Sequence, residues 1–128
     1  MHDFYWFKLY VACNAGLVTL LACNVSRLRM REQVPNGDGG KLVLKKAIRA
    51  HANGVEHATI FGLLVLALSV VTLPPGALAT LVCGFSLARL AHAWGMLGPQ
   101  FNARRAGAGL TFVLELAAVA LLLAYGVM

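Results

Sequence analysis

Charged residues are scarce in this chain of 128 residues. Asp, Glu, Lys and Arg make up 12% of it, 59% of the residues are hydrophobic, and the mean hydropathy is +0.73. A soluble domain carries about 25% charged residues, so this composition excludes an ordinary soluble domain and indicates a polytopic membrane protein. At about 20 residues for each spanning helix, the length allows four spans and no separate soluble domain.

Cysteine is also scarce, and its placement excludes two further classes. The chain has three cysteines, Cys13, Cys23 and Cys83. Cys13 and Cys23 would lie about 15 Å apart along one helix, which is too far for a disulfide. The spacing matches neither a disulfide framework nor a zinc site, so we interpret all three as small apolar residues and expect no metal.

Acidic residues are few, 5 against 11 Lys and Arg, which gives a formal net charge of +6. The basic residues flank apolar runs, so they predict membrane orientation rather than a nucleic-acid partner. The loop between the first two runs holds seven of them and the loop before the last run holds two, namely Arg27, Arg29, Arg31, Lys41, Lys45, Lys46 and Arg49, then Arg104 and Arg105. The positive-inside rule places both loops in the cytoplasm and both termini on the opposite side of the membrane. We expect this membrane to be the cell inner membrane.

The apolar runs predict an all-α fold, a transmembrane four-helix bundle that forms one integral membrane domain over residues 1–128. We expect spans at about 5–25, 49–73, 77–97 and 106–125. The first run is too long for a signal peptide, and no small-residue cleavage site follows it. Pro74-Pro75-Gly76 predicts a very short turn and therefore an antiparallel second and third helix, and we expect a short loop over residues 100–105.

A polar stripe opens the second span. Arg49, Asn53 and Glu56 follow the i, i+4, i+7 spacing that places side chains on one helical face, and His57 comes next. An ionisable group in hydrocarbon costs about 2.5–3.5 kcal/mol or more unless it is paired or hydrated. Arg49 would suit a carboxylate, Glu56 an ammonium group and Asn53 an amide, which favours a zwitterionic peptide-like ligand. The alternative is that Arg49 extends to the lipid headgroups while Asn53 and Glu56 bind neighbouring helices.

Two further sets of charges lie on the later helices. Arg89 and Glu115 occur at similar depth on consecutive helices, which predicts an ion pair. A role of Arg89 in the ligand site and a pairing of Arg89 with Glu56 are the alternatives. Arg104 and Arg105 either signal topology or hold a thiol as its thiolate, since a nearby cation favours the charged form.

His57 and His92 are expected at the same depth on two antiparallel helices. Facing histidines in a membrane bundle can hold a haem. Histidines that are simply satisfied in the interior are the alternative.

The sequence Arg49-x-x-x-Asn53-x-x-Glu56 at the start of the second of four helices resembles the MAPEG family, the membrane-associated proteins in eicosanoid and glutathione metabolism. Arg89-Leu90-Ala91-His92 followed by Gly95-Met96 is similar to that family's third-helix motif, and the basic pair before the last span also matches. The resemblance covers nearly the whole chain. Many members carry tyrosine at the positions of His57, His92 and Met96, so this chain looks more like the bacterial branch than the eicosanoid synthases.

The resemblance implies a homotrimer in the lipid bilayer that binds glutathione between subunits at the cytoplasmic face. It implies that glutathione, as co-substrate, is conjugated to or reduces a lipophilic small molecule. Arg104 or Arg105 would stabilise the thiolate, one of Arg27, Arg29 or Arg31 would reach a carboxylate, and the binding residues would be Arg49, Asn53, Glu56, His57, Arg89 and His92. A non-catalytic glutathione- or lipid-binding membrane protein is the alternative function.

Overall fold

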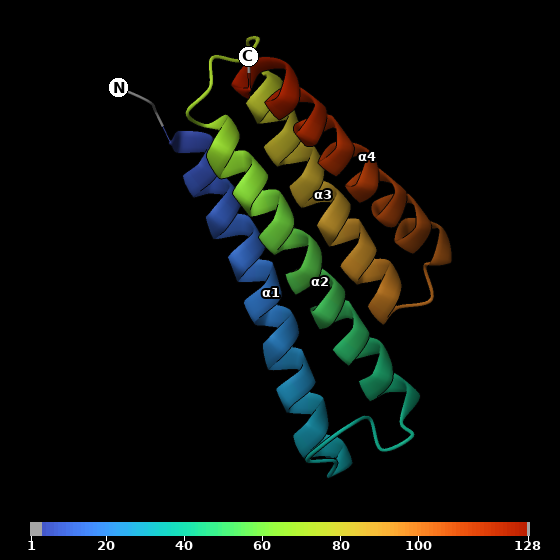
Figure 1. Cartoon of the computed structure of the whole chain (residues 1–128). Coiled ribbons are helices and arrows are strands. Elements are labelled where there is room, and N and C mark those ends of the chain that lie inside the picture. Colours follow the sequence, from blue (N-terminus) through green and yellow to red (C-terminus); the bar gives the residue numbers. More distant parts are fainter. Residues whose placement is uncertain (1–3, 128) are drawn as a thin grey trace.

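Four long helices make up nearly all of the protein (Figure 1). The computed structural model describes residues 4–127, and in these residues the helices are α1 (Tyr5–Glu32), α2 (Leu42–Leu68), α3 (Ala77–Leu97) and α4 (Phe101–Gly126), with no strand. The predicted all-α bundle is therefore confirmed.

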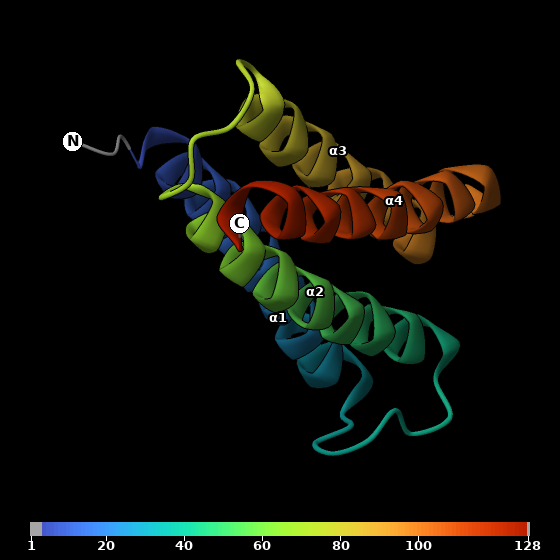
Figure 2. The same cartoon turned by 45° about the horizontal axis from the view of Figure 1, so that its top comes forward.

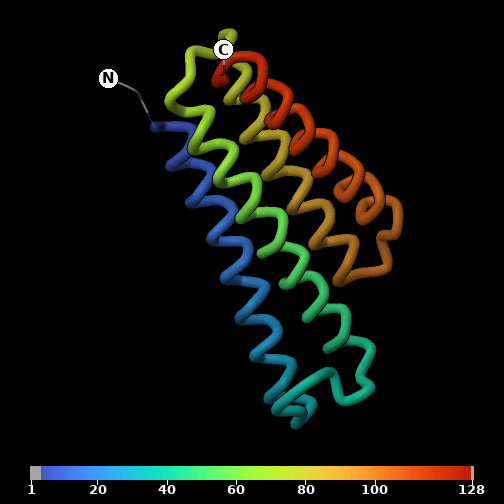
Figure 3. The backbone as a smooth tube through the Cα atoms, viewed as in Figure 1, coloured from blue at the N-terminus to red at the C-terminus, as the bar shows by residue number. Residues whose placement is uncertain are grey.

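The helices run antiparallel in sequence order, so the start of α1 and the end of α4 lie at the end of the bundle where α2 passes into α3 (Figures 1 and 3). Within the described residues, α2 and α3 contact each other and both outer helices, whereas α1 and α4 do not meet. Figure 2 shows α4 running along α2 and α3. A side chain of α4 can therefore meet groups from α2 and α3.

The helix ends differ from the expected spans at three places. α1 continues to Glu32 and stops at Gln33, which has a left-handed backbone conformation. α2 ends at Leu68, five residues before the expected end of the second span. α4 begins at Phe101, so Arg104 and Arg105 lie inside a helix rather than in the expected loop.

The early end of α2 has a local cause. The Ser69 hydroxyl donates a hydrogen bond of 2.7 Å to the carbonyl oxygen of Val65, and β-branched residues follow at positions 70–72. Such residues lose side-chain freedom in a helix, and Pro74 disfavours helical backbone at Leu73. Residues 69–76 therefore form a longer connection than the short turn that the proline pair predicted.

Three of the helices, α1, α3 and α4, are long and apolar enough to cross a membrane. α2 packs in the same bundle, but its first turns carry the polar residues at positions 45–57. All four helices present exposed leucines, among them Leu20, Leu63, Leu87 and Leu116. Outward apolar faces of this kind suit a hydrocarbon solvent.

The largest apolar core lies in the half of the bundle that contains the two termini. The rings of Phe61 and Phe85 stack there at 3.9 Å between centroids, and Tyr10 packs against both. The Tyr10 hydroxyl donates to the carbonyl oxygen of Ala58 at 2.6 Å. Polar interior groups begin at this level and continue toward the basic end.

Two glycines allow α3 and α4 to approach closely. A Cβ atom added to Gly107 of α4 would lie 2.6 Å from the Ala88 carbonyl oxygen and 2.6 Å from the His92 backbone nitrogen. A Cβ atom on Gly95 of α3 would collide with the backbone of Arg104. This contact brings the polar side chains of α3 directly against α4.

Candidate functional site

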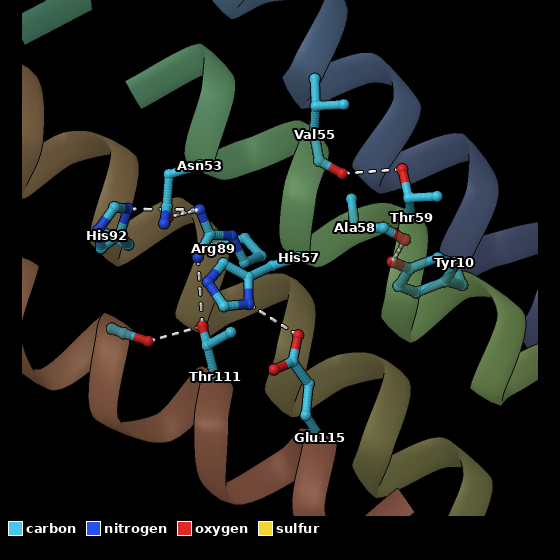
Figure 4. Close-up of polar contacts among 11 residues, drawn as sticks. Tyr10, Asn53, Val55, His57, Ala58, Thr59, Arg89, His92, Thr111 and Glu115 are labelled. Atoms are coloured by element: carbon cyan, nitrogen blue, oxygen red, sulfur yellow. Dashed lines mark hydrogen bonds and ion pairs between the residues drawn. The ribbon is translucent and has the colours of Figure 1, made fainter. Parts of the chain in front are cut away.

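A buried arginine forms the centre of a polar network between α2, α3 and α4 (Figure 4). Arg89 is only 2% exposed. Its Nη2 donates to Asn53 Oδ1 at 2.7 Å, its Nη1 donates to Thr111 Oγ1 at 3.4 Å, and Nη2 also lies 3.4 Å from His92 Nδ1. The Thr111 hydroxyl in turn donates to the carbonyl oxygen of Gly107 at 2.7 Å. The guanidinium thus links three helices through neutral partners.

A second bridge joins α2 to α4 one turn further along both helices. Nδ1 of His57 lies 2.8 Å from Oε1 of Glu115, and both side chains are about 15% exposed (15% and 14%). His57 follows Asn53, and Glu115 follows Thr111, by four residues each. Because i and i+4 share a helical face, the two bridges lie one above the other.

The predicted ion pair between Arg89 and Glu115 is wrong, and so is the alternative pair between Arg89 and Glu56. Among the described residues, the acid within ion-pair distance of a group on another helix is Glu115, and its partner is His57. Glu115 lies one turn beyond Thr111, which contacts Arg89, and the rotation of α4 turns the Glu115 carboxylate toward α2. Thr111, which occupies the place opposite Arg89, carried no signal in the sequence, since a hydroxyl within an apolar helix is common.

The polar stripe on α2 divides into an inner and an outer part. Asn53 and His57 are half-buried and belong to the network, whereas Arg49 and Glu56 are exposed. Each residue turns a helix by about 100°, so positions 53 and 57 lie on the edge of the stripe nearest α3 and α4. Within the described residues, the side chains of Arg49 and Glu56 have neither a hydrogen bond nor an ion pair.

The basic pair on α4 also separates into two environments. Arg104 lines a small cavity of about 170 Å³ together with Lys46 of α2 and Met96 of α3. The Arg105 guanidinium instead lies 5.7 Å from the centre of the exposed Phe101 ring. Arg104 is therefore the member of the pair that faces the other helices, a distinction that the sequence spacing left open.

The three arginines at the end of α1 make local contacts. Arg27 donates to Asn24 at 2.9 Å, and Arg31 pairs with Glu32 at 2.9 Å. Arg29 donates to the carbonyl oxygen of Gly37 at 2.7 Å, which holds the following loop against the helix end. None of these contacts reaches the network around Arg89.

The two histidines that suggested a haem have separate partners. His92 is buried beside Arg89, and the ring of His57 makes an edge contact with Phe112 at 5.2 Å between centroids. One nitrogen of each ring already faces another side chain. Each ring is therefore engaged at Nδ1 by a different neighbouring side chain.

A bundle with apolar outer faces, polar groups at its centre and basic residues at one end defines the class as a polytopic membrane protein. The sequence profile of the MAPEG family matches residues 7–125. The chain is also 37% identical over 108 residues to the inner membrane protein YecN of Escherichia coli, in strain K12 and in strain CFT073, covering 81% of this chain and 79% of that protein. This chain belongs to the MAPEG family.

Proposed function

We propose that this protein is a glutathione transferase-like membrane protein that conjugates or reduces lipophilic electrophiles with the glutathione thiolate. The observation that carries the proposal is the exposure of Arg49 and Glu56 beside Asn53, on a helix of a MAPEG bundle. Glutathione has two carboxylates and an α-amine, so it offers partners to the Arg49 and Glu56 side chains, which have none among the described residues of one chain. Arg can bind a carboxylate through two parallel hydrogen bonds.

The position of these groups favours a site between subunits. Charged side chains at membrane depth are stable when they face protein, ligand or water rather than lipid. In a homotrimer the exposed face of α2 would lie against a neighbouring copy, and glutathione would complete the interface. The basic end of the bundle would face the cytoplasm of a cell whose inner membrane holds the protein, with both termini on the opposite side.

The proposed reaction uses the cation at the start of α4. Arg104, which shares a cavity with Lys46, would stabilise the glutathione thiolate. The thiolate attacks an electrophilic carbon, a sulfur–carbon bond forms, and the leaving group departs with its bonding electrons. The apolar spans deliver the electrophile through the bilayer, and holding both reactants at one place supplies proximity.

Glutathione binding tests Arg49 first. We expect Arg49→Ala to weaken the binding of glutathione about tenfold or more, because a hydrogen bond to a charged group contributes about 1.5–3 kcal/mol. Lys45→Ala is the matched control, since Lys45 is exposed one turn earlier on the same helix. Isothermal titration calorimetry on the purified protein measures both. Equal affinities for the two variants and the parent protein would support the alternative in which Arg49 only reaches lipid headgroups.

The two arginines of α4 provide a second test, because they are adjacent in sequence but differ in environment. We expect Arg104→Ala to lower the turnover of glutathione with a chlorodinitroarene by about 10²-fold, the loss typical of one electrostatic contact in a reacting site. Arg105→Ala should change it by less than about threefold, because the Arg105 guanidinium lies against the Phe101 ring and does not line the cavity that Arg104 lines.

The comparison of these two variants separates the possible outcomes. A larger loss for Arg105→Ala would reverse the assignment within the pair. Binding of glutathione without turnover, with this substrate and with a lipid hydroperoxide, would favour the non-catalytic binding protein. Absence of both would reject the proposed function.

A further inference from the structure

The bridge between His57 and Glu115 determines which nitrogen of the histidine ring faces the carboxylate. The carboxylate of Glu115 accepts, so Nδ1 of His57 carries the proton that spans the 2.8 Å between them. A carboxylate bound at one ring nitrogen holds the imidazole in one tautomer and orientation. In the uncharged form of the ring, Nε2 then presents a lone pair.

That second nitrogen is available. Among the described residues Nε2 of His57 has no hydrogen bond. The fully enclosed polar side-chain atoms without a partner in the described residues are Arg89 Nε and Gln100 Oε1, so Nε2 of His57 is not fully enclosed. The side chain of His57 is 15% exposed. A small polar group can therefore approach the free lone pair.

A cation lies within one helical turn of this base. Arg89 bridges Asn53 and Thr111, and the bridge between His57 and Glu115 stands four residues further along each of the same two helices. One turn is about 5.4 Å. Two further titratable groups lie nearby: His92 of α3 beside Arg89, and Tyr10 of α1, whose hydroxyl donates to the carbonyl oxygen of Ala58, the residue after His57. A base, a carboxylate that orients it and a nearby guanidinium are the parts needed to make and hold a thiolate.

We propose that His57 is the general base that removes the thiol proton of glutathione and that Glu115 is the residue that positions it. This assignment rests on the proposed function for the identity of the substrate, but it makes Arg89 rather than Arg104 the cation nearest the thiolate, because Glu115 lies eleven residues, about 16 Å, beyond Arg104 along α4. The S–H bond breaks, its electron pair stays on sulfur, and Nε2 of His57 takes the proton. The thiolate then displaces a leaving group from the electrophile, and the imidazolium returns its proton to that leaving group or to water.

The test compares pH profiles of kcat/KM for glutathione in the intact protein and its variants. We expect His57→Gln to lose about 10²-fold at neutral pH, the smaller end of the effect of a general base. The loss should shrink as the pH rises, because a free thiol ionises near pH 8.5 without help. Glu115→Gln should lose less, and Glu115→Asp should retain most activity because it keeps the carboxylate. His51→Gln, on the same helix and outside both bridges, is the control.

A second readout is independent of the electrophile. The ultraviolet absorbance of the thiolate, recorded when glutathione is added at neutral pH, should appear with the parent protein and be lost in His57→Gln while calorimetry still detects binding. Circular dichroism confirms that each variant is folded. A parallel pH profile and an unchanged thiolate signal in folded His57→Gln would overturn the assignment while leaving the proposed function intact. A parent protein that neither binds glutathione nor turns it over would overturn both.

Discussion

Gly107→Ala is expected to destabilise the protein by about 1–3 kcal/mol, the usual cost of forcing extra volume into a packed interior. The new methyl carbon would lie 2.6 Å from two backbone atoms of α3, the Ala88 oxygen and the His92 nitrogen. Backbone atoms inside a helix cannot turn away as a flexible side chain can, so α3 and α4 must separate. The separation would also lengthen the hydrogen bond between Arg89 and Thr111, which is already 3.4 Å.

The control for this substitution lies two residues further along the same helix. A Cβ atom on Gly109 meets nothing within 4 Å. Replacing glycine by alanine inside a helix then gains about 0.5–1 kcal/mol through backbone entropy, so Gly109→Ala should be neutral or slightly stabilising. The same chemical change is thus expected to act in opposite directions at the two sites.

Thermal unfolding in detergent, followed by circular dichroism, measures both variants of this pair. The expected order of midpoints is Gly109→Ala at or above the parent protein and Gly107→Ala well below it. Equal midpoints for the two variants would contradict the close approach of α3 and α4.

The sequence predicted the fold because the fold follows from hydrophobic runs and their lengths. Apolar runs of about 20 residues with basic flanks specify the number of helices and their antiparallel order with little dependence on side-chain detail. The end of α2 at Leu68 and the start of α4 at Phe101 were missed because both depend on local backbone preferences. Such boundaries shift by a few residues without any change in the hydrophobic pattern.

The site was predictable as a set of residues but not as a set of pairs. Helical spacing grouped Arg49, Asn53 and Glu56, of which Asn53 is half-buried and the other two are exposed, whereas the predicted interior positions of Arg89 and His92 are confirmed. Which of them touch depends on how far each helix is rotated about its axis, and apolar surfaces on nearly every side of these helices leave that rotation unmarked in the sequence. Glu115 is an example. Its position along α4 predicted a pair with Arg89, but the rotation of α4 places its carboxylate against His57.

Arg89→Met is expected to cost about 3–5 kcal/mol, the usual result of removing one member of a buried charge system. The guanidinium is 2% exposed, and its direct partners, Asn53, Thr111 and His92, are all neutral acceptors. Glu115 is the acid that acts on it electrostatically across one helical turn. If the charges of Arg89 and Glu115 compensate each other, removal of Arg89 leaves the carboxylate without its counter-charge.

A double-mutant cycle with Glu115→Gln tests this balance. If the two charges stabilise each other, Glu115→Gln should cost less in the Arg89→Met background than in the parent protein, and the difference should be about 0.5–3 kcal/mol. Leu116→Ala, a substitution at a 70% exposed neighbour of Glu115, supplies the control cycle and should be additive with Arg89→Met. Denaturant or thermal unfolding in detergent measures the free energy of unfolding of each single and double variant.

The sign of the coupling decides between two descriptions of the interior. Additive costs for Arg89 and Glu115 would mean that neutral hydrogen bonds from Asn53 and Thr111 are enough to hold the guanidinium, and that Glu115 serves His57 alone. A favourable coupling would mean that the two bridges between α2 and α4 act as one electrostatic unit, since Coulomb interactions in a low-dielectric interior extend beyond direct contact. In that case a proton gained by His57 changes the charge beside Arg89, and the same pair that orients the base also sets how strongly the interior attracts a thiolate.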